Sequence, residues 1–240
     1  MLVVNIHQVN YLPWIGFFSK VMSADMYVMF DIVDFVNENW MHRNRIKGPG
    51  GPIWLTIPIA RKYYRRPFLE VMLPDDRRWA MKHWKTIMAC YKKADYFESY
   101  SGFFEDLYKN IHRYRTLNEL NSEIILHLLR VLDINVEVVR ASELDIPPGL
   151  KKTDLVLAVL EAVGGDVLIT GTGAKKYLDV RKFEERGHKV IFHEFKCPRY
   201  KQLWEDPGFI PNLSITDLLF NEGDNAPKIL SKTLAHVRKS

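Results

Sequence analysis

Polar and aromatic side chains follow the first apolar stretch of the chain directly. Residues 2–6 read LVVNI, and immediately after them come His7, Gln8, Asn10 and Tyr11, with Val9 between. An imidazole is well suited to accept a proton near neutral pH, and side-chain amides can bind hydroxyl groups or a developing oxyanion. The stretch predicts the floor of a ligand site. The alternative for His7 is a core histidine that is hydrogen-bonded to backbone.

Basic residues gather in a second part of the chain. The chain has a net charge of +5, and most of the excess of basic over acidic residues lies in the stretches HRNRIK (42–47) and RKYYRR (61–66). Such a density of cations near aromatic side chains suits the phosphate groups of a nucleotide, a nucleotide-sugar or RNA. The alternative is a solvated basic hairpin without a ligand.

Apolar periodicity indicates the elements that must position these residues. A buried strand (2–6), a helix (14–23) and a second buried strand (26–31) form a unit of the size of a βαβ crossover. A basic hairpin (36–66) with a Gly-Pro-Gly-Gly-Pro turn follows and is expected to protrude from the sheet, and a helical insert spans about 75–132. Strands and helices then alternate at 135–142, 151–164, 166–178, 188–195 and 214–223.

This pattern predicts one α/β domain over residues 1–240, with a doubly wound, mostly parallel sheet. In such sheets, ligands lie beyond the carboxyl ends of the strands. His7 follows the first strand, Asp31 ends the second, and TGTGAKKY places Gly171, Gly173 and Lys175 after a later one. We therefore expect these residues to share one crevice.

The first loop resembles the start of a nucleotidyltransferase, in which a Pro-rich turn precedes a His-x-Gly-His signature. Here PWIGF places Trp14 and Phe17 where the two histidines would lie. Without those imidazoles the chain lacks the donors that stabilise the transition state of adenylyl transfer. A nucleotidyltransferase-like Rossmannoid sheet and a nucleotide-like ligand remain the expectation, whereas adenylyl transfer does not follow.

Several longer motifs resemble the WbqC-like protein family. They are HQ-x-NYLPW-x-G-F-x-x-K, FD-x-V-x-F, RNRIK…G…WLTIPI, TGTGA…YLD, PRYKQ and F-I-PNLSITDLLFNEG, in this order from Ile6 to Gly223. The family usually has Pro after His-Gln, where this chain has Val9. The resemblance implies as site residues His7, Gln8, Asn10, Tyr11, Trp14, Lys20, Asp31, Arg43, Asn44, Arg45, Lys47, Gly171, Gly173, Tyr177, Tyr200, Gln202, Ser214 and Asp217, to which the strand-end pattern adds Lys175.

The resemblance implies a setting in the biosynthesis of bacterial surface polysaccharide, such as the O-antigen of lipopolysaccharide. We expect a transferase that joins an acyl or aminoacyl group to the amine of a nucleotide-linked amino sugar. His7, Gln8 and Asp31 are the predicted catalytic residues, with His7 as the general base, and the other site residues are predicted to bind substrate. The acyl donor is left open among an aminoacyl-tRNA, an acyl-coenzyme A and an ATP-activated acid.

Two other functional classes stay open: a non-catalytic module that binds a nucleotide-sugar or a partner protein, and an RNA- or tRNA-binding protein that stacks bases on Trp40, Tyr63 and Tyr64.

Composition indicates the cellular location and the kinds of site to expect. No apolar run approaches 18 residues, so no membrane insertion is expected, and a cytoplasmic location is expected. Cys90 and Cys197 are expected to be free thiols, and no metal site is predicted. A homodimer is left open.

Overall fold

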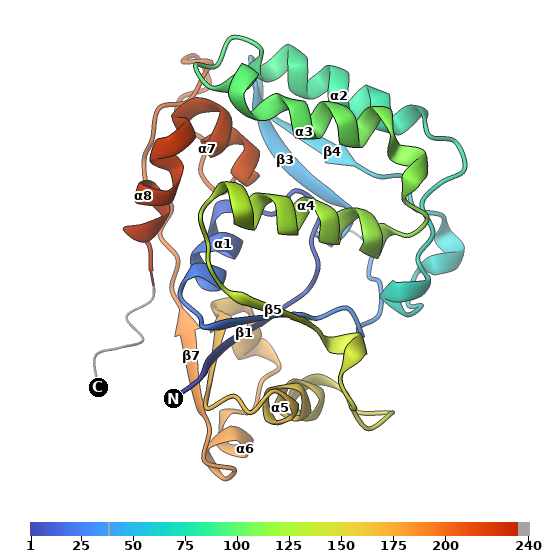
Figure 1. Ribbon diagram of the computed structural model, residues 1–240, viewed down its shortest axis with the longest axis vertical. Helices are drawn as coiled ribbons and strands as arrows, with labels where there is room; N and C mark the ends of the chain where they lie inside the picture. The colour runs from blue at the N-terminus through green and yellow to red at the C-terminus, as the bar shows by residue number, and fades with distance from the viewer. Residues whose placement is uncertain (38, 235–240) are drawn as a thin grey trace.

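Five parallel strands form the main sheet, in the order β5–β2–β1–β6–β7 (Figure 1). The computed structural model describes residues 1–37 and 39–234, so residue 38 of the predicted hairpin and residues 235–240 of the predicted domain lie outside the described residues. The strands are β1 (Val3–His7), β2 (Met26–Met29), β5 (Glu137–Arg140), β6 (Val167–Gly171) and β7 (Lys189–His193). The predicted α/β fold with a parallel sheet is confirmed.

Helices cover both faces of this sheet. Side chains alternate along β2, so that Tyr27 and Met29 pack in the cluster that contains α1 (Ile15–Met22), whereas Met26 and Val28 face the other way. The second face packs against α5 (Lys152–Ala162) and α6 (Val180–Glu184), which lie below the sheet in Figure 1. This two-sided burial explains why the strand sequences are almost continuously apolar.

A long segment joins the neighbouring strands β2 and β5. It contains the antiparallel pair β3 (Arg43–Gly48) and β4 (Gly51–Thr56), followed by α2 (Arg78–Tyr91), α3 (Phe97–Lys109) and α4 (Leu117–Val131). The last helices of the described residues, α7 (Ile215–Glu222) and α8 (Ala226–Ser231), lie beside this layer (Figure 1). None of the helices in the described part of the chain is both long and apolar enough to cross a membrane.

The hairpin β3–β4 packs into the helical layer, although the sequence suggests that it protrudes. The side chains of Asn44, Ile46 and Lys47 are buried, and the Lys47 amide donates to the Tyr91 hydroxyl of α2 at 2.8 Å. The amide of Ser214, just before α7, donates to the Arg45 carbonyl at 2.9 Å. The hairpin is therefore held from two sides.

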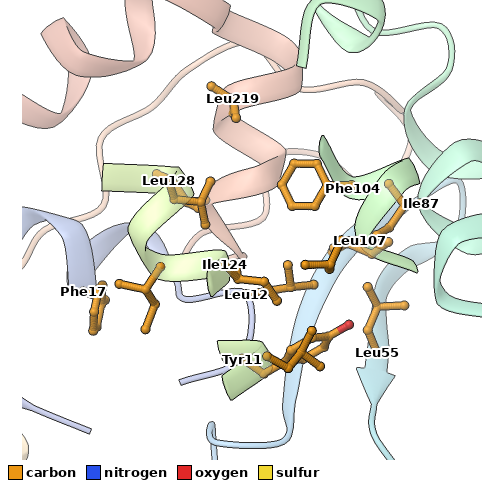
Figure 2. Packing of buried hydrophobic residues seen from close by; sticks show 14 of the residues in the cluster. Tyr11, Leu12, Phe17, Leu55, Ile87, Phe104, Leu107, Ile124, Leu128 and Leu219 are labelled. Atoms are coloured by element: carbon orange, nitrogen blue, oxygen red, sulfur yellow. The ribbon is translucent and has the colours of Figure 1, made fainter. Parts of the chain in front are cut away.

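The loop between β1 and α1 (residues 8–14) runs through the core. Because buried carbonyl groups need hydrogen-bond donors, two amide side chains serve it: Asn121 Nδ2 donates to the Val9 carbonyl at 2.9 Å, and Asn44 Nδ2 donates to the Leu12 carbonyl at 2.7 Å. Figure 2 shows Leu12 among side chains of the helical layer. These contacts fix the loop that carries Gln8, Asn10, Tyr11 and Trp14.

Replacing Asn121 by Leu tests this role of the amide. Leucine has a similar volume but cannot donate to the Val9 carbonyl or to the second backbone carbonyl, of Met41, that Asn121 reaches at 2.7 Å. We expect the free energy of unfolding to fall by about 2–4 kcal/mol, as measured by urea denaturation. The control Asn135→Ala changes an exposed asparagine and should stay within about 0.5 kcal/mol of the parent. Equal stability of Asn121→Leu and the parent would contradict the assignment.

Candidate functional site

A cavity of about 550 Å³ lies at the carboxyl edge of the sheet, where β1, β6 and β7 end. The predicted site residues that line it are His7, Gln8, Asn10, Trp14, Lys20, Arg45, Gly171, Gly173 and Tyr177. A more open hollow of about 700 Å³ lies between the hairpin and α2, and it contains none of the predicted site residues. The cavity at the sheet edge therefore brings together nine of the predicted site residues.

Lys20 is a buried cation in this cavity. Its side chain is 5% exposed, and burial lowers its pKa to about 8. Among residues 1–37 and 39–234 no carboxylate lies within ion-pair distance of it. The ammonium lies 5.6 Å from the centroid of the Trp14 ring, and a methyl group added at Gly171 would lie 3.5 Å from Nζ. The cavity thus holds a positive charge that the protein itself does not neutralise.

Trp14 forms an aromatic wall beside this lysine. Its indole lies against Gly16, where an added Cβ would be 2.3 Å from the ring, so only glycine fits there. The edge-on ring of Phe195 packs at 5.1 Å between centroids. Trp14 is thereby fixed as a flat surface next to the Lys20 charge.

His7 is a neutral imidazole whose tautomer is set by the backbone. Nδ1 lies 3.0 Å from the Gln8 carbonyl, which can only accept, so Nδ1 carries the hydrogen and Nε2 keeps a lone pair. Burial, and then the charge of Lys20, lowers the pKa of His7 to about 3. The ring also packs edge-on to Phe17, with centroids 5.0 Å apart. At neutral pH His7 therefore offers an acceptor.

His193 is a second histidine of the cavity, which sequence reasoning missed. It ends β7, and its Nε2 lies 2.7 Å from the Ser19 hydroxyl. That hydroxyl donates to the Thr233 carbonyl, so His193 is the donor in the first bond. The rule that selects His7, a polar residue at the carboxyl end of a strand, also selects His193.

The polar atoms of the cavity favour a negatively charged, hydroxyl-bearing ligand. Of the described residues that line it, none is Asp or Glu. Asn10 Oδ1 and Arg45 Nε are buried without a hydrogen-bond partner in the described structure. Within the same described ranges, no group of His, Cys, Asp and Glu could hold a metal ion. Lys20 and Arg45 can bind an anion, and the amides of Gln8 and Asn10 can bind hydroxyl groups.

A further set of predicted site residues surrounds the buried carboxylate of Asp217 instead. It accepts hydrogen bonds from the hydroxyls of Tyr91 (2.6 Å) and Tyr200 (2.7 Å) and from Gln202 Nε2 (2.9 Å). Burial raises the pKa of Asp217, and the charge of nearby Lys47 opposes this shift. Because these polar groups already satisfy one another, they link the C-terminal segment to the hairpin and do not line the cavity.

The remaining predicted residues also lie outside the cavity lining, each with partners in the protein. The Asp31 carboxylate accepts from the Ser142 amide and hydroxyl at 2.9 and 2.8 Å. The Tyr11 hydroxyl is buried against His83 and Tyr108. The other placements are Asn44 beneath the loop, Arg43 over the Trp54 ring, Lys175 paired with Glu194, and Ser214 as the N-cap of α7.

Lys20→Met tests whether the lysine is an uncompensated buried charge. The folded-state pKa lies below the unfolded value, so the folded protein loses its proton first and stability rises with pH between about 8 and 10.5. At pH 7 we expect the variant to be more stable by about 3 kcal/mol, an advantage that shrinks toward pH 10. Urea denaturation at both pH values measures it, with the exposed Lys175→Met as control. An advantage that does not vary with pH would contradict the assignment.

Comparison with known proteins places this chain in one family. The model of the WbqC-like protein family matches residues 8–229. A protein of Mycobacterium tuberculosis named "Uncharacterized protein Rv1507c" is 30% identical over 228 residues, which cover 95% of this chain and 96% of that protein. The family match includes the cavity residues from Gln8 to Phe195 and the network around Asp217. The chain belongs to the WbqC-like protein family.

Proposed function

We propose that this protein is an enzyme of bacterial surface-polysaccharide biosynthesis that transfers an acyl or aminoacyl group to the amine of a nucleotide-linked amino sugar. The observation that carries the proposal is the cavity at the sheet edge. It combines a buried Lys20, an arginine, a neutral imidazole and two amide side chains, and no carboxylate of the described residues lines it. Membership of the WbqC-like protein family supports the proposed setting.

The charge of the cavity supports a phosphorylated ligand. A buried ammonium without a counter-ion is costly, and a bound anion removes that cost. Lys20 and the guanidinium of Arg45 line the same cavity, so a diphosphate can contact both. The indole of Trp14 offers a flat apolar face to a sugar ring beside these cations.

The reaction uses the atoms that the cavity presents. The amine nitrogen of the sugar attacks the acyl carbon, and the bond from that carbon to the oxygen or sulfur of the donor breaks. The proton leaves the nitrogen for His7 Nε2, and the imidazolium then gives this same proton to the departing oxygen or sulfur, which returns His7 to its neutral form. Lys20 is paired with the diphosphate, Asn10 Nδ2 stabilises the negative charge that develops on the acyl oxygen, and Gln8 binds a sugar hydroxyl.

Substrate binding makes His7 a better base. The pKa of His7 is about 3, which makes it a weak proton acceptor. An anion beside Lys20 offsets the charge that is the second cause of the lowering, so the pKa of His7 rises when the substrate is bound. Base strength is then coupled to the presence of the phosphorylated substrate.

The same low pKa favours a second candidate function, a non-catalytic module that binds a nucleotide-sugar. In that function the neutral imidazole is a hydrogen-bond acceptor for the ligand and moves no proton. The two functions share the cavity and the ligand. They differ in whether an amide is formed.

His7→Asn separates them. Asparagine keeps a donor for the Gln8 carbonyl but has no basic nitrogen. We expect turnover with an amino-sugar nucleotide and an acyl donor to fall about 100- to 10,000-fold while the dissociation constant of the sugar nucleotide stays within about threefold. His193→Asn, which removes the other histidine of the cavity, should retain most of the turnover. Absence of any amide product with the parent protein would leave the binding module as the function.

A thermal-shift screen identifies the ligand class. The panel contains uridine- and thymidine-diphosphate amino sugars, coenzyme A thioesters, nucleoside triphosphates and a short RNA. Ligands that bind the folded state raise the unfolding midpoint. We expect a rise with the amino-sugar nucleotides that disappears in Arg45→Ala and persists in the matched variant Arg61→Ala, because Arg61 is exposed and does not line the cavity. A rise with RNA and none with sugar nucleotides would overturn the proposal.

A further inference from the structure

Two exposed tryptophans stack where the cavity meets solvent. Trp40 and Trp54 are 39% and 45% exposed, and their ring centroids are 5.7 Å apart at an interplanar angle of 29°. Trp40 also lines the cavity, whereas Trp54, on β4, does not. Apolar side chains that are exposed singly are common on protein surfaces, but these two large rings form one continuous stacked surface. We call this pair the tryptophan platform.

Guanidinium groups accompany the platform. Arg43 Cζ lies 4.6 Å and Arg45 Cζ 5.6 Å from the centroid of the Trp54 ring. The strand register explains this, because Arg45 pairs directly with Trp54 and Arg43 is two residues away on the same face. Arg45 also lines the cavity, so one arginine connects the aromatic stack to the interior.

An aromatic face beside guanidinium groups has the chemistry of a nucleotide site. Bases stack on aromatic side chains, and arginine binds the adjoining phosphates. A sugar alone requires no such charge. Trp40 and Lys20 both line the cavity, and Trp40 is exposed whereas Lys20 is buried, so a ligand with its base at the surface and its phosphates inside would contact both.

We propose that Trp40, supported by Trp54, is the stacking surface for the base of a nucleotide whose phosphates contact Arg45. The inference rests on the proposed function in using the same cavity, and it adds where the nucleoside lies. Because stacking uses the ring face, which every base has, the site should discriminate only modestly between uracil and adenine. The nucleotide belongs either to a sugar nucleotide or to the 3′ end of an RNA.

Calorimetric titration of the full chain with uridine diphosphate, adenosine diphosphate and inorganic pyrophosphate tests this. We expect the nucleotides to bind about tenfold more tightly than pyrophosphate. Trp40→Leu should remove that difference and leave the pyrophosphate affinity within about twofold, whereas Trp40→Phe should retain most of it. The control Leu69→Ala alters another exposed apolar side chain that does not line the cavity. Trp40 bonds to the loop through its backbone carbonyl, which all these variants keep.

Three results would overturn the inference. The first is that the parent binds nucleotides and pyrophosphate with equal affinity. The second is that Trp40→Leu weakens the binding of nucleotides and of pyrophosphate equally. The third is that Trp40→Leu dissociates a dimer, which would make the platform a subunit interface. Tighter binding of a CCA-ended RNA than of mononucleotides, with a steep salt dependence and loss in Trp40→Leu, would support the inference with RNA as the source. The titrations measure binding and need no turnover. Stacking on Trp40 can therefore be shown even if no amide forms, and amide formation can be shown even if Trp40 does not stack the base.

Discussion

The burial of the loop between β1 and α1 is the constraint on which the site depends. A strand-to-helix connection usually lies at the surface, where water satisfies its backbone. Here Val9, Tyr11 and Leu12 have no exposed surface, and Leu12 adopts a left-handed backbone with φ of 42°. A nonglycine residue keeps such a conformation only where its surroundings determine it. Asn44 and Asn121 do so by donating to the loop carbonyls from the hairpin and from α4.

Through this anchoring, the helical layer helps to position the side chains that line the cavity. The layer lies far along the chain from β1, yet it holds the backbone that presents His7, Gln8 and Asn10 to the cavity. A loop bound only by water would let these side chains sample many positions, and a proton acceptor needs placement within a fraction of an ångström. The interior of the layer and the edge of the sheet therefore form one physical unit, joined through residues 8–14.

Part of the candidate site can be predicted from the sequence because the position of a residue relative to its own strand is a local property. Polar residues at the carboxyl ends of parallel strands meet at one edge, so His7 and Gly171 could be assigned to the same crevice before the structure was known. Asp217, Tyr200 and Gln202 looked equally functional because they are polar residues in unusual motifs. Their role depends on Tyr91, which lies 126 residues from Asp217 in the chain, and no local pattern encodes that distance. The polarity of a side chain shows that it forms hydrogen bonds. The fold determines whether its partner is a ligand or another group of the protein.

The network around Asp217 and the cavity are mechanically connected. The same C-terminal segment that places Asp217 also donates the Ser214 amide to the Arg45 carbonyl, and a backbone bridge joins Ser214 to Trp14. A buried carboxylate with three donors tolerates little displacement, since each lost hydrogen bond removes part of what stabilises the buried carboxylate. Arg45 and Trp14 consequently derive their positions from residues that never touch the cavity. The polar residues of the C-terminal segment therefore help to fix the position of the cavity side chains.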